Sequence, residues 1–172
     1  MLVEDQTLDM IREIVLEVAD YFVANNVTLS VAESFTGGAI VESLVSVPGA
    51  STYLREGVIC YTNDAKKYRL GVESATLERY GAVSEKTIRE MIRGLLDSPL
   101  KPDYAVATTG NAGPGVEDKS ERGVCYVAVG FKDEIKVKRV ILTGDRRENI
   151  SEGTLIALQA LMETVNKQRG EI

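Results

Sequence analysis

The stretch Val31-Ala32-Glu33-Ser34-Phe35-Thr36-Gly37-Gly38 decides where this chain places its chemistry. It closes an apolar run over residues 27–31, which is typical of a buried strand, and opens onto residues 38–47, whose pattern predicts a helix. A strand that gives way to hydroxyl groups and two glycines at a helix start forms a polar pocket lined by backbone N–H groups. Ser34 is the candidate nucleophile in this pocket.

The chain of 172 residues contains no histidine. If Ser34 attacks a substrate, its base is therefore a lysine, a tyrosine or a carboxylate, and a Ser-His-Asp triad is excluded. Nothing in the sequence resembles a zinc site, because it has neither histidines nor paired cysteine knuckles. We expect no metal and no cofactor. Cys60 and Cys125 both lie in apolar, strand-like runs, which predicts buried, reduced thiols.

The composition predicts a soluble protein with one domain over residues 1–172. A net charge of −6 argues against a nucleic-acid partner. No apolar run approaches the roughly 20 residues that span a bilayer, so no membrane partner is expected. The first residues are acidic and unlike a signal peptide, which indicates a cytoplasmic protein. The apolar first helix offers a surface for homo-oligomerisation.

Hydrophobic periodicity predicts strands that alternate with helices. The helices are expected over residues 7–24, 38–47, 66–70, 75–80, 85–96 and 145–167. The strands are expected over residues 27–31, 57–61, 104–108, 124–131 and 134–142. This order is typical of an α/β fold, a three-layer α/β/α sandwich around a mixed, mostly parallel sheet of about five strands. The hairpin formed by the last two strands requires one antiparallel strand.

Three polar turns follow strands of the predicted sheet, at residues 34–38, 61–66 and 108–114. In sheets of this kind, ligands bind beyond the carboxyl ends of the parallel strands, so we expect the three turns to lie together. Lys66 lies one turn past a predicted helix cap at Asn63 and can point back toward the strand end. A positive helix end and partial desolvation favour a neutral amine there, which can take the proton from Ser34. Tyr61 can relay that proton or orient the amine.

Each further candidate has a structural alternative. Glu33 is a second possible base, but side chains of adjacent strand residues face opposite sides, which favours a role in bonding the helix start. Ser51 and Thr109 are candidate site residues that can equally cap a turn or loop. Arg146 can bind a phosphate with its planar group of donors, or form a salt bridge at a helix start. Lys66 taken alone is more often a surface lysine on a helix than a catalytic base.

Five motifs in this order resemble the C-terminal domain of the CinA (competence/damage-inducible) family, the PncC nicotinamide-nucleotide amidases. The motifs are Ala32-Glu33-Ser34-Phe35-Thr36-Gly37-Gly38, Tyr61-Thr62-Asn63-Asp64-Ala65-Lys66, Gly81-Ala82-Val83-Ser84, Gly110-Asn111-Ala112-Gly113-Pro114 and Gly144-Asp145-Arg146. The resemblance runs over about residues 11–161. It implies a three-layer α/β/α sandwich and hydrolysis of the carboxamide of nicotinamide mononucleotide to nicotinate mononucleotide and ammonia, in pyridine-nucleotide salvage.

The resemblance also implies roles for individual residues. Ser34 is the expected nucleophile, Lys66 its base and Tyr61 a third catalytic residue. The expected substrate-binding residues are Thr36, Gly37, Gly38, Ser51, Thr109, Gly110 and Arg146. Backbone N–H groups around residues 36–38 are candidates for stabilising the oxyanion.

A rival hypothesis is a nucleotide-binding or regulatory module that keeps the pocket without turnover. It is suggested by Ile150 and Ser151, which stand where bacterial members of the family often carry a further arginine pair. A third reading is a purely structural subunit. The three hypotheses differ in whether the protein binds a nucleotide and whether it releases ammonia.

Overall fold

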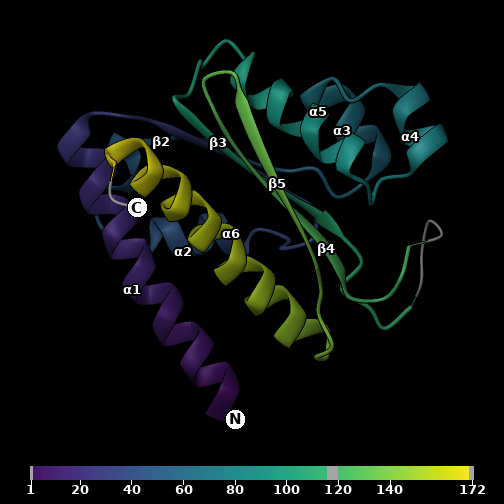
Figure 1. Ribbon diagram of the computed structural model, residues 1–172, viewed down its shortest axis with the longest axis horizontal. Helices are drawn as coiled ribbons and strands as arrows, with labels where there is room; N and C mark the ends of the chain where they lie inside the picture. Colours follow the sequence, from purple (N-terminus) through teal and green to yellow (C-terminus); the bar gives the residue numbers. More distant parts are fainter. Residues whose placement is uncertain (1, 116–119, 171–172) are drawn as a thin grey trace.

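A five-stranded mixed sheet forms the middle of the molecule (Figure 1). The computed structural model describes residues 2–115 and 120–170. The strands are β1 (Leu29–Glu33), β2 (Leu54–Ile59), β3 (Tyr104–Gly110), β4 (Val124–Phe131) and β5 (Glu134–Ile141). Their order is β2-β1-β3-β4-β5; β1 pairs in parallel with β2 and β3, whereas β4 is antiparallel to both β3 and β5. The mixed sheet with one antiparallel strand is therefore confirmed.

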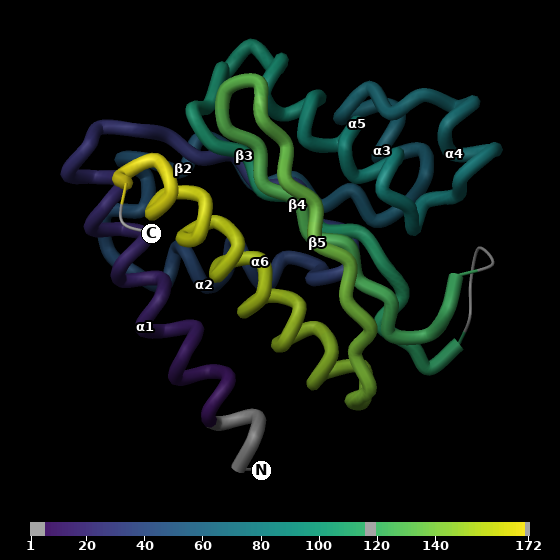
Figure 2. The backbone as a smooth tube through the Cα atoms, in the orientation of Figure 1, coloured from purple at the N-terminus to yellow at the C-terminus, as the bar shows by residue number. Residues whose placement is uncertain are grey.

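Helices cover both faces of this sheet, which confirms the predicted three-layer α/β/α sandwich (Figures 1 and 2). On one face lie α1 (Leu2–Asn25), α2 (Ala39–Val45) and α6 (Arg146–Arg169), and on the other lie α3 (Asn63–Leu70), α4 (Ser74–Tyr80) and α5 (Glu85–Leu96). A short 3-10 helix, η1 (Ala50–Thr52), precedes β2. Among the described residues, no helix combines the length and the apolar character that crossing a membrane requires.

Two apolar clusters, one on each face, hold the layers together. Successive residues of a strand face opposite sides of the sheet, so β1 sends Val31 to the cluster under α1 and α6 and Ala32 to the cluster under α5. The same alternation places Glu33 and Ser34 on opposite sides at the end of β1. The turn between β1 and α2 therefore sends its side chains to both sides of the sheet.

Several element boundaries agree with the sequence prediction and others differ for local reasons. The predicted bounds of α5 and β4 are confirmed. The strand β1 begins two residues later than predicted, because the carboxylate of Asp103 accepts hydrogen bonds from the N–H and hydroxyl of Thr28, at 2.8 Å each, just before the strand. The cap of α3 is Thr62 rather than Asn63: the Thr62 side chain accepts a hydrogen bond from the Ala65 N–H.

The start of α6 is fixed by a capping box. Asp145 accepts hydrogen bonds from the N–H groups of Arg147 and Glu148, and Glu148 accepts one from the Asp145 N–H. This confirms the prediction of a helix start at this aspartate. It also fixes Arg146, the first residue of α6, at the edge of the sheet where β1, β2 and β3 end.

Candidate active site

The turn between β1 and α2 is built around the buried carboxylate of Glu33. Its two oxygens accept four hydrogen bonds, from the N–H groups of Gly38, Ile40 and Val41 and from the hydroxyl of Thr36. Three of these donors belong to the start of α2, where N–H groups have no partner within a helix. The structural role predicted for Glu33 is therefore what the structure shows, and its side chain lies on the face opposite Ser34.

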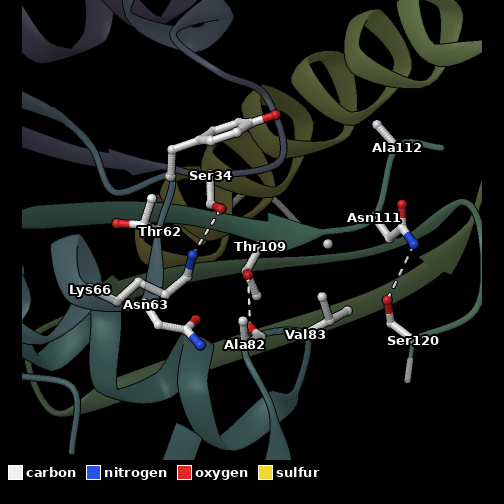
Figure 3. A pocket seen from close by; sticks show the side chains of 12 residues that line it. Ser34, Thr62, Asn63, Lys66, Ala82, Val83, Thr109, Asn111, Ala112 and Ser120 are labelled. Atoms are coloured by element: carbon white, nitrogen blue, oxygen red, sulfur yellow. Dashed lines mark hydrogen bonds between the residues drawn. The ribbon is translucent and has the colours of Figure 1, made fainter. Parts of the chain in front are cut away.

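Ser34 is held at the point where β1 ends and its hydroxyl lies on the α3 side of the sheet. Its N–H donates to the carbonyl of Thr108 at 3.0 Å, which ties the residue to β3. The side chain of Lys66 approaches from the first turns of α3, and its Nζ is hydrogen-bonded to Ser34 Oγ at 2.9 Å (Figure 3). The predicted pairing of these two side chains is present.

Lys66 is buried although it carries an amine: only 1% of it is exposed, against 8% for Ser34. Its Nζ also donates to the carbonyl of Cys60 at 2.8 Å. The carbonyl fixes the amine at the end of β2, while the hydroxyl of Ser34 lies within reach on the other side. Burial disfavours a charged amine, and a neutral amine has a lone pair that can accept the serine proton.

The pair opens into a cavity of about 470 Å³. Figure 3 shows Ser34 and Lys66 at one end of this cavity, Thr109 near the middle, and Asn111 with Ser120 at the other end. The lining residues come from all three predicted turns and from two further segments: Ser34, Tyr61, Thr62, Asn63, Lys66, Ala82, Val83, Thr109, Gly110, Asn111, Ala112 and Ser120. The expectation that three separate turns lie together is confirmed.

Tyr61 and Arg146 are joined at the rim of this cavity. The Tyr61 side chain is 58% exposed, and its hydroxyl accepts a hydrogen bond from Arg146 Nη2 at 2.7 Å. The other end of the guanidinium, Nη1, donates to the carbonyl of Gly113 at 2.6 Å. The arginine therefore links the turn after β2, the glycine-rich turn after β3 and the start of α6. Its two partners are uncharged, so its positive charge stays at the mouth of the cavity.

The remaining predicted substrate-binding residues fall into two groups. Thr109 and Gly110 line the cavity, and the Thr109 hydroxyl donates to the carbonyl of Ala82 at 2.8 Å. Thr36, Gly37 and Gly38 are not among the lining residues. They shape the turn itself: φ is +62° at Gly37 and +112° at Gly38, a region that favours glycine.

The structure does not bring Ser51 to this site, which corrects the prediction for that residue. Ser51 lies in η1, just before β2 begins, whereas the cavity lies where β2 ends. A strand advances about 3.3 Å per residue, so the length of β2 separates Ser51 from Lys66 by roughly 20 Å. Ser51 is exposed at the opposite edge of the sheet.

Seven lining residues were not predicted as site residues: Thr62, Asn63, Ala82, Val83, Asn111, Ala112 and Ser120. All but Ser120 lie in motifs that the sequence singles out, and for those that follow a parallel strand this position was the available signal. Ser120 carries no such signal, because it reaches the cavity from the segment before β4.

The two cysteines are buried, as predicted, and burial raises the pKa of both the Cys60 and the Cys125 thiol. Within the described residues, no group of three or more acidic, cysteine or histidine side chains is placed to hold a metal ion.

Comparison with known proteins assigns the chain to a family. Residues 11–165 match the family model described as the CinA C-terminal domain. The chain belongs to this family. It is 42% identical over 142 residues to a CinA-like protein of Fusobacterium nucleatum, an alignment that covers 82% of the chain and 34% of that protein. It is 41% identical over 153 residues to a putative competence-damage inducible protein of Clostridioides difficile, covering 88% of the chain and 35% of that protein.

Solved structures of the CinA superfamily share the fold over nearly their whole length. The competence damage-inducible protein A of Klebsiella pneumoniae superposes with a TM-score of 0.85 at 33% identity, covering 90% of the chain and 96% of that structure. A competence/damage-inducible protein of Agrobacterium tumefaciens gives a TM-score of 0.84 at 32% identity, covering 90% and 94%. By contrast, the chain spans about a third of the length of the curated relatives it matches.

Proposed function

We propose that residues 1–172 form one domain that deamidates nicotinamide mononucleotide, giving nicotinate mononucleotide and ammonia. One observation carries this proposal: a buried lysine amine lies 2.9 Å from a serine hydroxyl at the end of a cavity. A serine activated by an adjacent base is the usual requirement for covalent hydrolysis of an amide. Membership of the CinA family supports the choice of the substrate.

In the first half of the proposed reaction, Lys66 Nζ accepts the proton of the Ser34 hydroxyl. The serine oxygen then forms a bond to the carboxamide carbon, whose oxygen becomes an oxyanion. Backbone N–H groups are the usual donors to such an oxyanion, and the residue after the nucleophile often supplies one. The N–H of Phe35 has no hydrogen-bond partner within residues 2–115 and 120–170, which leaves it available for this role.

In the second half, the carbon–nitrogen bond breaks and the departing nitrogen takes the proton from Lys66, so ammonia leaves and an ester remains on Ser34. Lys66 next accepts a proton from a water molecule, whose oxygen attacks the ester carbon. The bond to Ser34 breaks, its oxygen regains a proton, and the carboxylate product leaves. Lys66 thus acts as a base and then as an acid in each half.

Two pairs of variants test this proposal with matched controls. The protein is incubated with nicotinamide mononucleotide, and ammonia and nicotinate mononucleotide are measured. Ser34→Ala and Lys66→Met are each expected to lower the rate by about 10³-fold or more. Ser51→Ala and Lys67→Met, a distant serine and the neighbouring lysine, are expected to keep the rate of the unmodified protein.

Failure of the unmodified protein to release ammonia above the level of Ser34→Ala contradicts the proposal. In that case, stabilisation against thermal unfolding by the nucleotide, without product, would support the binding module instead. Equal loss in the Ser51→Ala control would show that the assay does not report on the pair at the cavity.

A further inference from the structure

Gly153 is an unexpected residue at its position in α6. It lies inside a 24-residue helix, where glycine costs about 1 kcal/mol relative to alanine. Its φ angle is not among the positive ones, so the backbone does not require a glycine there. A Cβ atom built at this position would lie 2.7 Å from Cε1 and 2.9 Å from Cδ1 of the Phe35 ring, closer than carbon atoms approach in proteins. The glycine is therefore explained by the space that the ring of Phe35 occupies.

A second glycine contacts the opposite edge of the same ring. A Cβ atom at Gly110, the last residue of β3, would lie 2.6 Å from Cδ2 of Phe35 and 2.3 Å from the carbonyl oxygen of Val124. Gly110 and Gly153 thus present bare backbone to the two sides of one aromatic ring. Only 4% of Phe35 is exposed, so the ring has little freedom to move.

Phe35 follows Ser34 directly, and the two side chains lie on opposite sides of the turn. The hydroxyl of Ser34 faces Lys66, while the ring of Phe35 packs in the cluster under α6. The Ser34 N–H is fixed by Thr108, so a fixed ring on the next residue holds the serine from its carboxyl side as well. Movement of the ring would be passed to Ser34 through one planar peptide unit.

We propose that Phe35, held between Gly110 and Gly153, is a positioning residue that sets the place of the Ser34 hydroxyl relative to Lys66. The proposal rests on the function proposed above and adds to it the group that aims the nucleophile. It connects the first half of α6 to the reacting oxygen, although Gly153 is not among the residues that line the cavity.

The expected size of the effect follows from the contact distances. An alanine methyl group at position 153 needs about 3.5–4.0 Å to an aromatic carbon, so the ring must move by roughly 1 Å from its present place. A misplacement of about 1 Å at a reacting group costs on the order of 100-fold in rate. Gly153→Ala is therefore expected to lower kcat about 100-fold and to leave KM for nicotinamide mononucleotide unchanged, because the cavity wall keeps its residues.

A compensating change separates positioning from general damage. Phe35→Leu shortens the side chain and makes room for the methyl group, so the double variant Phe35→Leu/Gly153→Ala is expected to recover about tenfold in kcat over Gly153→Ala alone. Glu152→Ala, at the exposed neighbouring position of α6, is the control and is expected to retain full activity. Thermal unfolding establishes that each variant is folded at the assay temperature.

Two further measurements cover the cases in which Gly153→Ala does not fold or the unmodified protein releases no ammonia. If Gly153→Ala does not fold, Phe35→Leu alone must lower kcat with KM unchanged. Covalent labelling of Ser34 by a fluorophosphonate, followed by intact mass, reports the reactivity of the hydroxyl without using the amide substrate. A labelling rate that falls in Gly153→Ala and recovers in the double variant supports the positioning role even if the unmodified protein releases no ammonia, in which case only the proposed function fails.

Three results would overturn the positioning role. The first is a folded Gly153→Ala variant with unchanged kcat and labelling rate. The second is a double variant no faster than Gly153→Ala. The third is an unmodified protein in which Ser34 is neither labelled nor active, which overturns the proposed function as well.

Discussion

Replacement of Glu33 by glutamine tests how far the turn that carries the nucleophile depends on one carboxylate. The side chain of Glu33 is fully buried and accepts four hydrogen bonds. Three of these go to one oxygen, Oε2, and the fourth joins Oε1 to the N–H of Val41 at 2.9 Å. Glutamine keeps the shape of the side chain, so its amide oxygen can take the place of Oε2. Its NH₂ group must then face the N–H of Val41, and that donor loses its acceptor.

The expected loss of stability follows from the number and kind of hydrogen bonds that the substitution changes. A hydrogen bond to a charged group contributes about 1.5–3 kcal/mol and one between neutral groups about 0.5–1.5 kcal/mol. Glu33→Gln removes one of the stronger kind and converts three to the weaker kind, while the buried amide costs less to desolvate than the carboxylate. We expect a loss of about 3 kcal/mol in the free energy of unfolding. For a chain of this size, this corresponds to a fall in Tm of roughly 6–12 °C.

Urea unfolding followed by circular dichroism, together with calorimetry, measures both quantities. The control is Glu42→Gln, which makes the same chemical change at an exposed position in the first turn of α2. This control is expected to change stability by less than about 0.5 kcal/mol. If Glu33→Gln unfolds at the same denaturant concentration as the control, with the same slope, the carboxylate does not hold the turn and the reasoning is refuted.

Two more predictions concern the rim of the cavity and the buried thiols. Tyr61→Phe keeps the ring but removes the hydroxyl that accepts a hydrogen bond from Arg146. Steady-state kinetics should then show a higher KM for nicotinamide mononucleotide and a kcat close to that of the unmodified protein. A lower kcat with unchanged KM would instead show that the phenol carries a proton in the reaction. Burial raises the pKa of Cys60 and Cys125, so less thiolate is present at any pH below the raised pKa, and both thiols should react with Ellman's reagent at pH 8 only after denaturant is added. Rapid reaction of the native protein would contradict this assignment.

The sequence carried enough local signal to predict the layers and the reacting pair. The hairpin of β4 and β5 and the helix α5 have uninterrupted periodicity and clear turn residues, so their positions were predictable. The pairing of Ser34 with Lys66 followed from a general property of parallel sheets, which collect the turns after several strands at one edge. These inferences need only the order of the elements along the chain.

Other features depended on contacts between distant segments. The late start of β1 is set by Asp103, which lies 75 residues away from its partner Thr28. The misplacement of Ser51 arose because its role came from family likeness alone, while its place in the chain, before β2, puts it at the wrong edge of the sheet. The contact of Phe35 with Gly153 could not be predicted, because the spacing of two residues over a hundred positions apart says nothing of whether they meet.

The way Lys66 is anchored has a consequence for altering this protein. Its amine is fixed by a main-chain oxygen of residue 60, not by the sulfur of that residue. The side chain at position 60 can therefore be replaced by a small apolar one, as in Cys60→Ala, which removes one of the two thiols of the chain without touching the anchor. The number of residues between positions 60 and 66 must stay the same. Inserting or deleting one would rotate the first turn of α3 and move the amine of Lys66 away from the carbonyl oxygen of residue 60.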